Sequence, residues 1–207
     1  MINKDDNLEI IKIGCFGDSS VGKTYFIRKY VNDIINIDWT LSTVGIEYYT
    51  TKKILSDGNE YKITIYDTAG QEKYKSLSLN SIRHCDGVIL MYDITNNESF
   101  NSISNWVNNM YDIKDDNFPF IIVGNKCDLK VQREVSEEEG LEIAEKYKTT
   151  FFEVSSREGI NVEKSVDELL KLFISKNIKT KTIPKNKTIK LDIRTSIAPH
   201  KHRCCKK

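Results

Sequence analysis

Long hydrophobic runs are absent from this 207-residue sequence. No stretch approaches the roughly 20 consecutive apolar residues that a membrane-spanning helix needs, which argues against an integral membrane protein built of helices. The first residues, Met1 to Asp6, are polar, and the apolar core of a secretory signal peptide is missing. We therefore expect the folded body to be soluble and cytosolic.

The sequence contains only five cysteines, which is an odd number. Cys15, Cys85 and Cys127 lie in or beside apolar runs, which is typical of buried thiols in a reducing compartment, so no structural disulfide is predicted. Internal repeats are also lacking. With 39% hydrophobic and 29% charged residues, the chain is long enough for one compact core and short for two domains.

The net charge of +1 conceals two regions of opposite charge. Residues 176–207 carry 11 basic side chains and one acidic side chain, a net of +10, which leaves 20 basic and 29 acidic, a net of −9, for the rest. This tail also lacks aromatic residues and apolar periodicity, so it cannot bury enough surface to offset the entropy of ordering. We predict a flexible N-terminus over 1–8, one domain over 9–175 and a disordered basic tail over 176–207.

Short apolar runs alternate with segments of helical period. The runs that predict strands are Ile11–Phe16, Tyr61–Tyr66, Gly87–Tyr92, Phe120–Val123 and Phe151–Val154. The segments that predict helices are Tyr25–Val31, Ser99–Met110, Val162–Phe173 and one that starts at a capping box of Ser136 and Glu139. This alternation indicates an α/β fold with a mostly parallel sheet and helices on both faces. The segment Ile46–Tyr66 contains a turn at Ser56–Asn59 and adds an antiparallel edge strand.

A phosphate-binding pattern follows the first predicted strand. Residues Gly17 to Thr24 read Gly-Asp-Ser-Ser-Val-Gly-Lys-Thr, which fits G-x-x-x-x-G-K-[ST], and a predicted helix follows. The glycines let backbone N–H groups wrap phosphates, and the helix N-terminus adds positive potential. We expect Lys23 to reach the β- and γ-phosphates and the Thr24 hydroxyl to ligate Mg²⁺. The other expected nucleotide contacts are Ser19, Ser20, Val21 and Gly22 in this loop and Tyr25 directly after it.

A base-reading motif, Asn125-Lys126-Cys127-Asp128, follows the fourth predicted strand at the end where ligands of such sheets bind. The Asp128 carboxylate can accept hydrogen bonds from N1–H and the 2-amino group of guanine, and adenine offers neither donor in that arrangement. Asn125 is expected to fix the loop and touch the base, and the Lys126 stem to cover its face. Alone the tetrapeptide is a weak signal, but with the phosphate loop it predicts GTP and GDP as ligands.

A third motif, Asp67-Thr68-Ala69-Gly70-Gln71, follows the strand that ends at Tyr66. Asp67 is expected to hold Mg²⁺, the Gly70 N–H to bond the γ-phosphate, and Gln71, the expected catalytic residue, to orient the attacking water. An ordinary Asp/Gly turn would explain these residue types but not their position in the sequence relative to the other two motifs. Together the motifs predict Mg²⁺-dependent hydrolysis of GTP to GDP.

From about Ile11 to Phe173 the sequence resembles the Ras-like small GTPase superfamily and, within it, the Rab family. The matching stretches are Gly17-Asp18-Ser19, Thr43-Val44-Gly45-Ile46-Glu47-Tyr48, and Tyr92-Asp93-Ile94-Thr95 with Ser99-Phe100 and Trp106. The resemblance implies a three-layer P-loop NTPase fold with a six-stranded sheet. It also implies that Thr43 ligates Mg²⁺ and contacts the γ-phosphate, and that backbone N–H groups of Ser155, Ser156 and Arg157 face the guanine carbonyl oxygen.

The resemblance implies a switch in vesicle trafficking on the cytoplasmic face of an intracellular membrane, cycling with the cytosol. Its partners would be an exchange factor, a GTPase-activating protein, a GDP-dissociation inhibitor, a prenylation escort and effectors that read the switch regions. Two departures affect the surface that partners read: Tyr66 stands where Trp is usual, and Ser81-Ile82 replaces a tyrosine pair before Arg83. Neither Arg83 nor Arg157 is placed by the resemblance to act as an internal arginine finger, so turnover should be slow.

The last residues, Cys204-Cys205-Lys206-Lys207, follow the basic tail, and the paired cysteines resemble Rab C-termini. Double prenylation is the predicted role, since a single C-a-a-X signal fits poorly and two lipid chains anchor where one binds reversibly. Stray surface cysteines, or metal binding with His200 and His202, are the alternatives.

For the whole chain the alternative functions are a scaffold that holds GTP without hydrolysing it, a nuclear-transport or cytoskeletal GTPase, and a nucleic-acid binder. No nucleic acid is expected, because no aromatic residues lie between the lysines of the tail.

Overall fold

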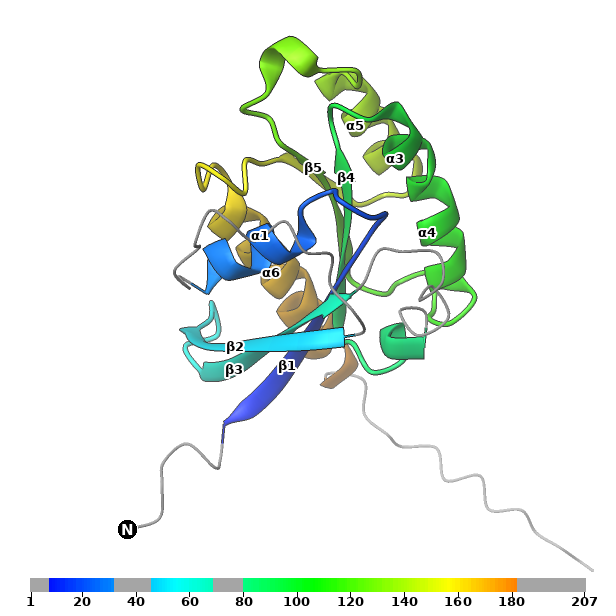
Figure 1. Ribbon diagram of the computed structural model, residues 1–207. Coiled ribbons are helices and arrows are strands. Elements are labelled where there is room, and N and C mark those ends of the chain that lie inside the picture. Colours follow the sequence, from blue (N-terminus) through cyan, green and yellow to red (C-terminus); the bar gives the residue numbers. More distant parts are fainter. Residues whose placement is uncertain (1–7, 32–45, 69–79, 182–207) are drawn as a thin grey trace, which may run out of the picture.

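The protein is described by a computed structural model that covers residues 8–31, 46–68 and 80–181. A six-stranded sheet forms its centre (Figure 1), and its spatial order is β2-β3-β1-β4-β5-β6. The strands are β1 (Glu9–Phe16), β2 (Ile46–Ile54), β3 (Glu60–Thr68), β4 (Gly87–Asp93), β5 (Phe120–Asn125) and β6 (Thr150–Glu153). Every neighbouring pair is parallel except β2 with β3, which form an antiparallel hairpin at the edge. The mostly parallel sheet with one antiparallel edge strand is confirmed.

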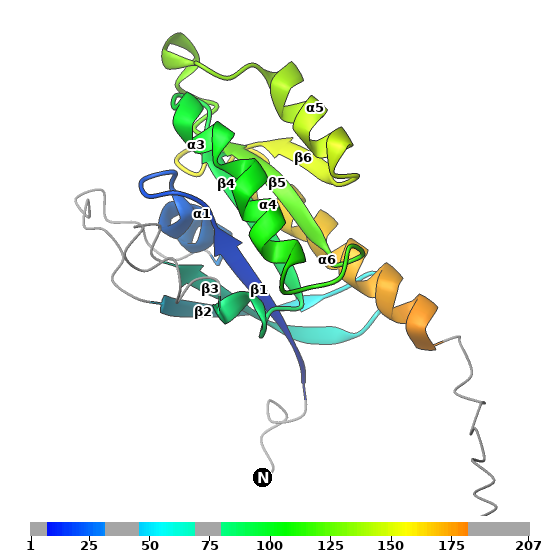
Figure 2. The same cartoon turned by 90° about the vertical axis from the view of Figure 1, so that its right-hand side faces the viewer.

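Helices cover both faces of the sheet, as Figures 1 and 2 show. One face carries α1 (Lys23–Tyr30) and α6 (Val162–Lys181), and the other carries α3 (Asn97–Asn101), α4 (Ile103–Tyr111) and α5 (Glu137–Lys146). A 3₁₀ turn, η3 (Lys130–Gln132), lies between β5 and α5. The expected three layers are therefore present.

Two helices differ from the sequence-based expectation. The segment predicted as one helix is divided into α3 and α4 at Ser102, which keeps helical dihedral angles. Helix α6 continues past Phe173 to Lys181, so the first six residues of the predicted tail, 176–181, are helical. The helix outlasts its apolar periodicity because no proline or glycine follows until Pro184, and its lysines are good helix formers. The capping box of Ser136 and Glu139 is confirmed at the start of α5.

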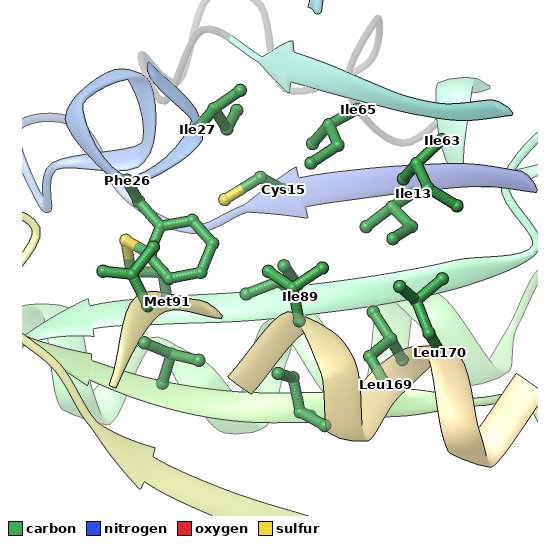
Figure 3. Packing of buried hydrophobic residues seen from close by; sticks show 14 of the residues in the cluster. Ile13, Cys15, Phe26, Ile27, Ile63, Ile65, Ile89, Met91, Leu169 and Leu170 are labelled. Carbon is green, nitrogen blue, oxygen red and sulfur yellow. The ribbon is translucent and has the colours of Figure 1, made fainter. Parts of the chain in front are cut away.

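Two hydrophobic clusters lie on opposite faces of the sheet. Alternation along β4, in which every residue is buried, sends Ile89 and Met91 to the α1/α6 side and Leu90 and Tyr92 to the other side. Figure 3 shows the first cluster, where side chains of the strands meet those of α1 and α6. A sheet buried on both faces is a rigid support for the loops at its ends.

The three cysteines in the described part of the chain belong to the two hydrophobic clusters or pack against them. Cys15 and Cys85 are buried thiols and Cys127 is half-buried, and burial raises the pKa of Cys85 to about 12. Within residues 8–31, 46–68 and 80–181, no helix combines the length and the apolar character needed to cross a bilayer.

Candidate functional site

The predicted motifs gather at one edge of the sheet. They follow the carboxyl ends of β1, β3, β5 and β6, and these ends share an edge because the four strands are parallel within the sheet. Strand β3 lies on one side of β1 in the sheet, and the next strand along the chain, β4, lies on the other side of β1. The strand order therefore reverses between β1 and β4, which is a topological switch point. Ligands of open α/β sheets bind in the crevice at such a point.

The phosphate loop packs so closely against its neighbours that two positions require glycine. Gly17 has φ 145°, and a Cβ there would lie 2.1 Å from the Met91 carbonyl oxygen. Gly22 has φ 100°, and a Cβ there would lie 2.3 Å from Asn125 Nδ2. Gly22 is also the N-cap of α1, so no side chain caps the first N–H groups of that helix. Such a helix start is a ready binding site for an anion.

Lys23 places a buried cation inside the loop. Its Nζ donates hydrogen bonds to the carbonyl oxygens of Gly17 at 3.0 Å and Asp18 at 2.7 Å, and the residue is only 6% exposed. Burial lowers the pKa of Lys23, while the nearby charges of Asp67 and Asp18 act in the opposite direction. A bound phosphate would favour the charged ammonium further.

Thr24 and Asp67 form an oxygen pair beside this lysine. The Thr24 hydroxyl donates a 2.6 Å hydrogen bond to Asp67 Oδ2, although the two residues come from α1 and β3. Asp67 is fully buried. Hydroxyl and carboxylate oxygens are the hard ligands that Mg²⁺ prefers, so the donor set fits this ion. The third expected ligand, Thr43, lies outside the described residues, as do Gly70 and Gln71.

The Asn125 side chain joins two loops. Its Nδ2 donates to the Val21 carbonyl oxygen at 2.8 Å, and its Oδ1 accepts from the Ser156 backbone N–H at 3.0 Å and the Ser156 hydroxyl at 2.9 Å. The side chain is 1% exposed, so these hydrogen bonds are shielded from water. Asn125 thereby ties the phosphate loop to the loop after β6.

Asp128 is oriented by the loop after β6. Its Oδ1 accepts a 2.6 Å hydrogen bond from the Ser155 hydroxyl, and the Ser155 oxygen in turn accepts one from the Glu158 N–H at 3.0 Å. The Asp128 residue is half-buried. The carboxylate predicted to select guanine is thus held in place by a neighbouring loop.

Lys126 has a partner that sequence reasoning did not identify. Its Nζ forms an ion pair with Asp93 Oδ2 at 2.5 Å, and Asp93 also accepts hydrogen bonds from the Thr95 N–H and hydroxyl. Lys126 itself has a left-handed φ of 68°. A carboxylate at the end of a predicted buried strand was the signal available for Asp93.

The loop after β6 departs in part from the expectation drawn from the resemblance. The Ser156 N–H is donated to Asn125, not left for a base. The N–H groups of Ser155, Glu158 and Gly159 are also donated within the protein. Among the described residues, no acceptor takes the Arg157 N–H.

The surroundings of two other residues were not predicted from the sequence. Ile82, expected on a surface read by partners, is fully buried in the cluster on the α4 side, because its helical turn packs against the sheet. Trp106 reaches the phosphate loop, where its Nε1 donates to Asp18 Oδ1 at 2.9 Å. The sequence marks Trp106 as part of the family resemblance and of the apolar face of its helix, but it gives no sign of this contact.

Comparison with known proteins agrees with this geometry. The sequence profile of the Ras family matches residues 12–175. The Ras-related protein Rab-3A of Homo sapiens is 39% identical over 175 residues, which are 84% of this chain and 79% of the relative. Rab-3C of Bos taurus is 38% identical over 84% of this chain and 76% of the relative, and Rab-3 of Caenorhabditis elegans is 38% identical over 83% and 78%. The chain therefore belongs to the Ras family, as a Rab-like small GTPase with the P-loop fold that hydrolyses GTP to GDP.

Proposed function

We propose that GTP and GDP bind across the carboxyl edge of the sheet, with the phosphates at Lys23 and the guanine at Asp128. The observation that carries this proposal is the Asn125 side chain, which bonds the phosphate loop at Val21 and the loop after β6 at Ser156. The two halves of the pocket are therefore held together by one buried amide. A ligand that fills both halves must carry phosphates at one end and a base at the other.

At the phosphate end, the backbone N–H groups of Ser19, Ser20, Val21 and Gly22 and the start of α1 would surround the phosphates, with Tyr25 near them. Lys23 would keep its bond to Asp18 and turn its charge toward the β- and γ-phosphates. Thr24 and Asp67 would hold Mg²⁺ with Thr43, and this ion neutralises charge that develops on the phosphates.

At the base end, the Asp128 carboxylate would accept from guanine N1–H and the 2-amino group. The Arg157 N–H would donate to the guanine carbonyl oxygen, with Ser155 and Ser156 holding Asp128 and Asn125. The Lys126 stem, fixed at its tip by Asp93, would cover one face of the base. Adenine would leave the half-buried carboxylate unpaired, so guanine is selected.

Hydrolysis would depend on Gln71, which orients the attacking water, and on Gly70, whose N–H bonds the γ-phosphate. An arginine from an activating protein is worth roughly 10³ to 10⁵ in rate in this class of enzyme, so the unaided chain should be slow. The γ-phosphate would order the segments around Thr43 and Gly70, and hydrolysis would release them. Effectors would read that difference.

Replacing Gln71 with leucine tests catalysis. Leucine cannot hydrogen-bond water, so we expect Gln71→Leu to slow single-turnover GTP hydrolysis at least tenfold, about 1.4 kcal/mol of barrier. Affinity for GTP should stay within about threefold, a difference below 1 kcal/mol. Unchanged hydrolysis would assign catalysis to another residue. A wild-type chain that binds GTP but never turns it over would favour the scaffold alternative.

The Rab-like relatives indicate membrane-associated vesicle trafficking. We propose attachment to the cytoplasmic face of an intracellular membrane through prenyl groups on Cys204 and Cys205, with exchange between membrane and cytosol. The basic residues that precede the cysteines would add about 1 kcal/mol each on an anionic leaflet. Exchange factor, activating protein, GDP-dissociation inhibitor, prenylation escort and effectors are the proposed partners, with no nucleic acid among them.

Removing both cysteines tests this attachment. We expect Cys204→Ser with Cys205→Ser to move the protein into the cytosolic fraction of cells, because one basic segment without lipid binds weakly. The matched control, Lys206→Ser with Lys207→Ser, should remain on membranes since it keeps both lipid sites. If the double serine variant sediments with membranes as the wild type does, lipidation at these cysteines is wrong.

A further inference from the structure

A tryptophan from the opposite face of the sheet enters the phosphate loop. Trp106 lies in α4, is 3% exposed, and packs its ring against Phe16, the last residue of β1, at a centroid distance of 6.2 Å. Its Nε1 donates to Asp18 Oδ1 at 2.9 Å, a contact between residues 88 positions apart. The tryptophan therefore contacts both the strand that supports the loop and the loop itself.

Asp18 is held at two points. Its carboxylate accepts from Trp106, and its backbone carbonyl oxygen accepts from Lys23 Nζ at 2.7 Å. The preceding residue, Gly17, packs against the Met91 carbonyl so closely that a Cβ added to it would lie 2.1 Å from that oxygen. With the side chain anchored and the chain confined, the Asp18 carbonyl is fixed in the position that holds the lysine ammonium.

The hydrogen bond between Trp106 and Asp18 also affects the repulsion between the Asp18 carboxylate and a bound phosphate. A carboxylate in a loop that binds phosphates repels them, and the repulsion grows with the charge of the ligand. Helix α1, whose start is the expected phosphate site, lies on one face of the sheet, and α4 lies on the other (Figure 2). The indole N–H of Trp106 thus holds the Asp18 carboxylate against α4.

We propose that Trp106 is a positioning residue of the nucleotide site, which uses its indole N–H to hold the Asp18 carboxylate away from the bound phosphates and to fix the Asp18 carbonyl against Lys23. The inference rests on the proposed function, because it assumes phosphates at this loop. It assigns to the tryptophan a role in discriminating ligand charge that packing alone does not require.

Phenylalanine keeps an aromatic ring but lacks the N–H, so Trp106→Phe separates positioning from packing. We expect this variant to bind GTP about tenfold more weakly and GDP about threefold more weakly in the presence of Mg²⁺, because the released carboxylate repels the more highly charged nucleotide more. The ratio of GTP to GDP affinity should therefore fall about threefold. Affinities are measured by titration of fluorescent nucleotide analogues and displacement with GTP and GDP.

A second substitution provides the rescue. Asparagine carries no charge but keeps an acceptor oxygen for the indole, so Asp18→Asn removes the repulsion and keeps the hydrogen bond, and alone it should not lower the ratio of GTP to GDP affinity. Added to Trp106→Phe, it should restore the wild-type ratio of GTP to GDP affinity. Met110→Leu, a buried change in the same helix, is the packing control and should leave that ratio unchanged.

The outcomes are distinct. If Trp106→Phe lowers both affinities equally, or Asp18→Asn fails to restore the ratio, Trp106 is a packing residue only and the inference is overturned. If the wild type binds neither GTP nor GDP at micromolar concentration with Mg²⁺, the proposed function itself fails. A loss of thermal stability in Trp106→Phe without a change in the ratio also overturns the positioning role.

Discussion

Gly22→Ala is expected to abolish tight nucleotide binding, with a loss of roughly 100-fold or more in affinity for both GTP and GDP. The added Cβ would lie 2.3 Å from Asn125 Nδ2, which must then leave its bond to the Val21 carbonyl oxygen. Displacing this amide also disturbs its contacts with Ser156. Each buried hydrogen bond that is broken costs about 1–3 kcal/mol, and two of them account for the expected loss.

Gly58→Ala is the matched control for backbone strain. Gly58 also has a left-handed φ, 79°, but a Cβ there has no atom within 4 Å. This variant should lose only about 1–2 kcal/mol of unfolding free energy, the cost of a left-handed alanine, with nucleotide affinity unchanged. Denaturant unfolding and nucleotide titration measure the two effects. Gly22→Ala binding within threefold of the wild type would show that nucleotide binding does not depend on the Asn125 contacts.

Asp128→Ala is expected to remove the preference for guanine. The carboxylate would accept two charge-assisted hydrogen bonds, each worth about 1.5–3 kcal/mol, so affinity for GTP should fall by roughly 10² to 10⁴. Affinity for ATP, which we expect to be weak in the wild type, should change little, because adenine makes neither bond. The ratio of GTP to ATP affinity from competition titrations is the deciding measurement.

Ser155→Ala provides a graded comparison. Its hydroxyl donates to Asp128 Oδ1 and lies in a fully buried residue, so its removal loosens the carboxylate without deleting it. We expect a loss of about tenfold in GTP affinity, the worth of one hydrogen bond to a charged group. An Asp128→Ala protein that still prefers GTP over ATP as strongly as the wild type would disprove the assignment of the base site.

The sequence predicted those parts of the fold that depend on local pattern. The nearly unbroken apolar runs of β4 and β5 predicted buried parallel strands, and the turn around Gly58 predicted the antiparallel edge hairpin. The capping box at Ser136 located the start of α5. These features follow from residue type and period over a few positions, which a single sequence displays directly.

The sequence alone also predicted the chemistry of the site, because the Gly17–Thr24 loop, Asp67 and Asn125–Asp128 each follow a strand and carry their proposed ligand groups within one short segment. Contacts between segments were decided by the tertiary structure: Asn125 to Val21 and Ser156, Lys126 to Asp93, and Trp106 to Asp18. Such contacts depend on which strands are neighbours and in what register they pair. The strand order β2-β3-β1-β4-β5-β6 is not encoded in any short segment of the sequence. The physical reason is that the local pattern permits many arrangements of the strands and helices. Burial of apolar side chains between segments that are distant in the sequence selects one of them.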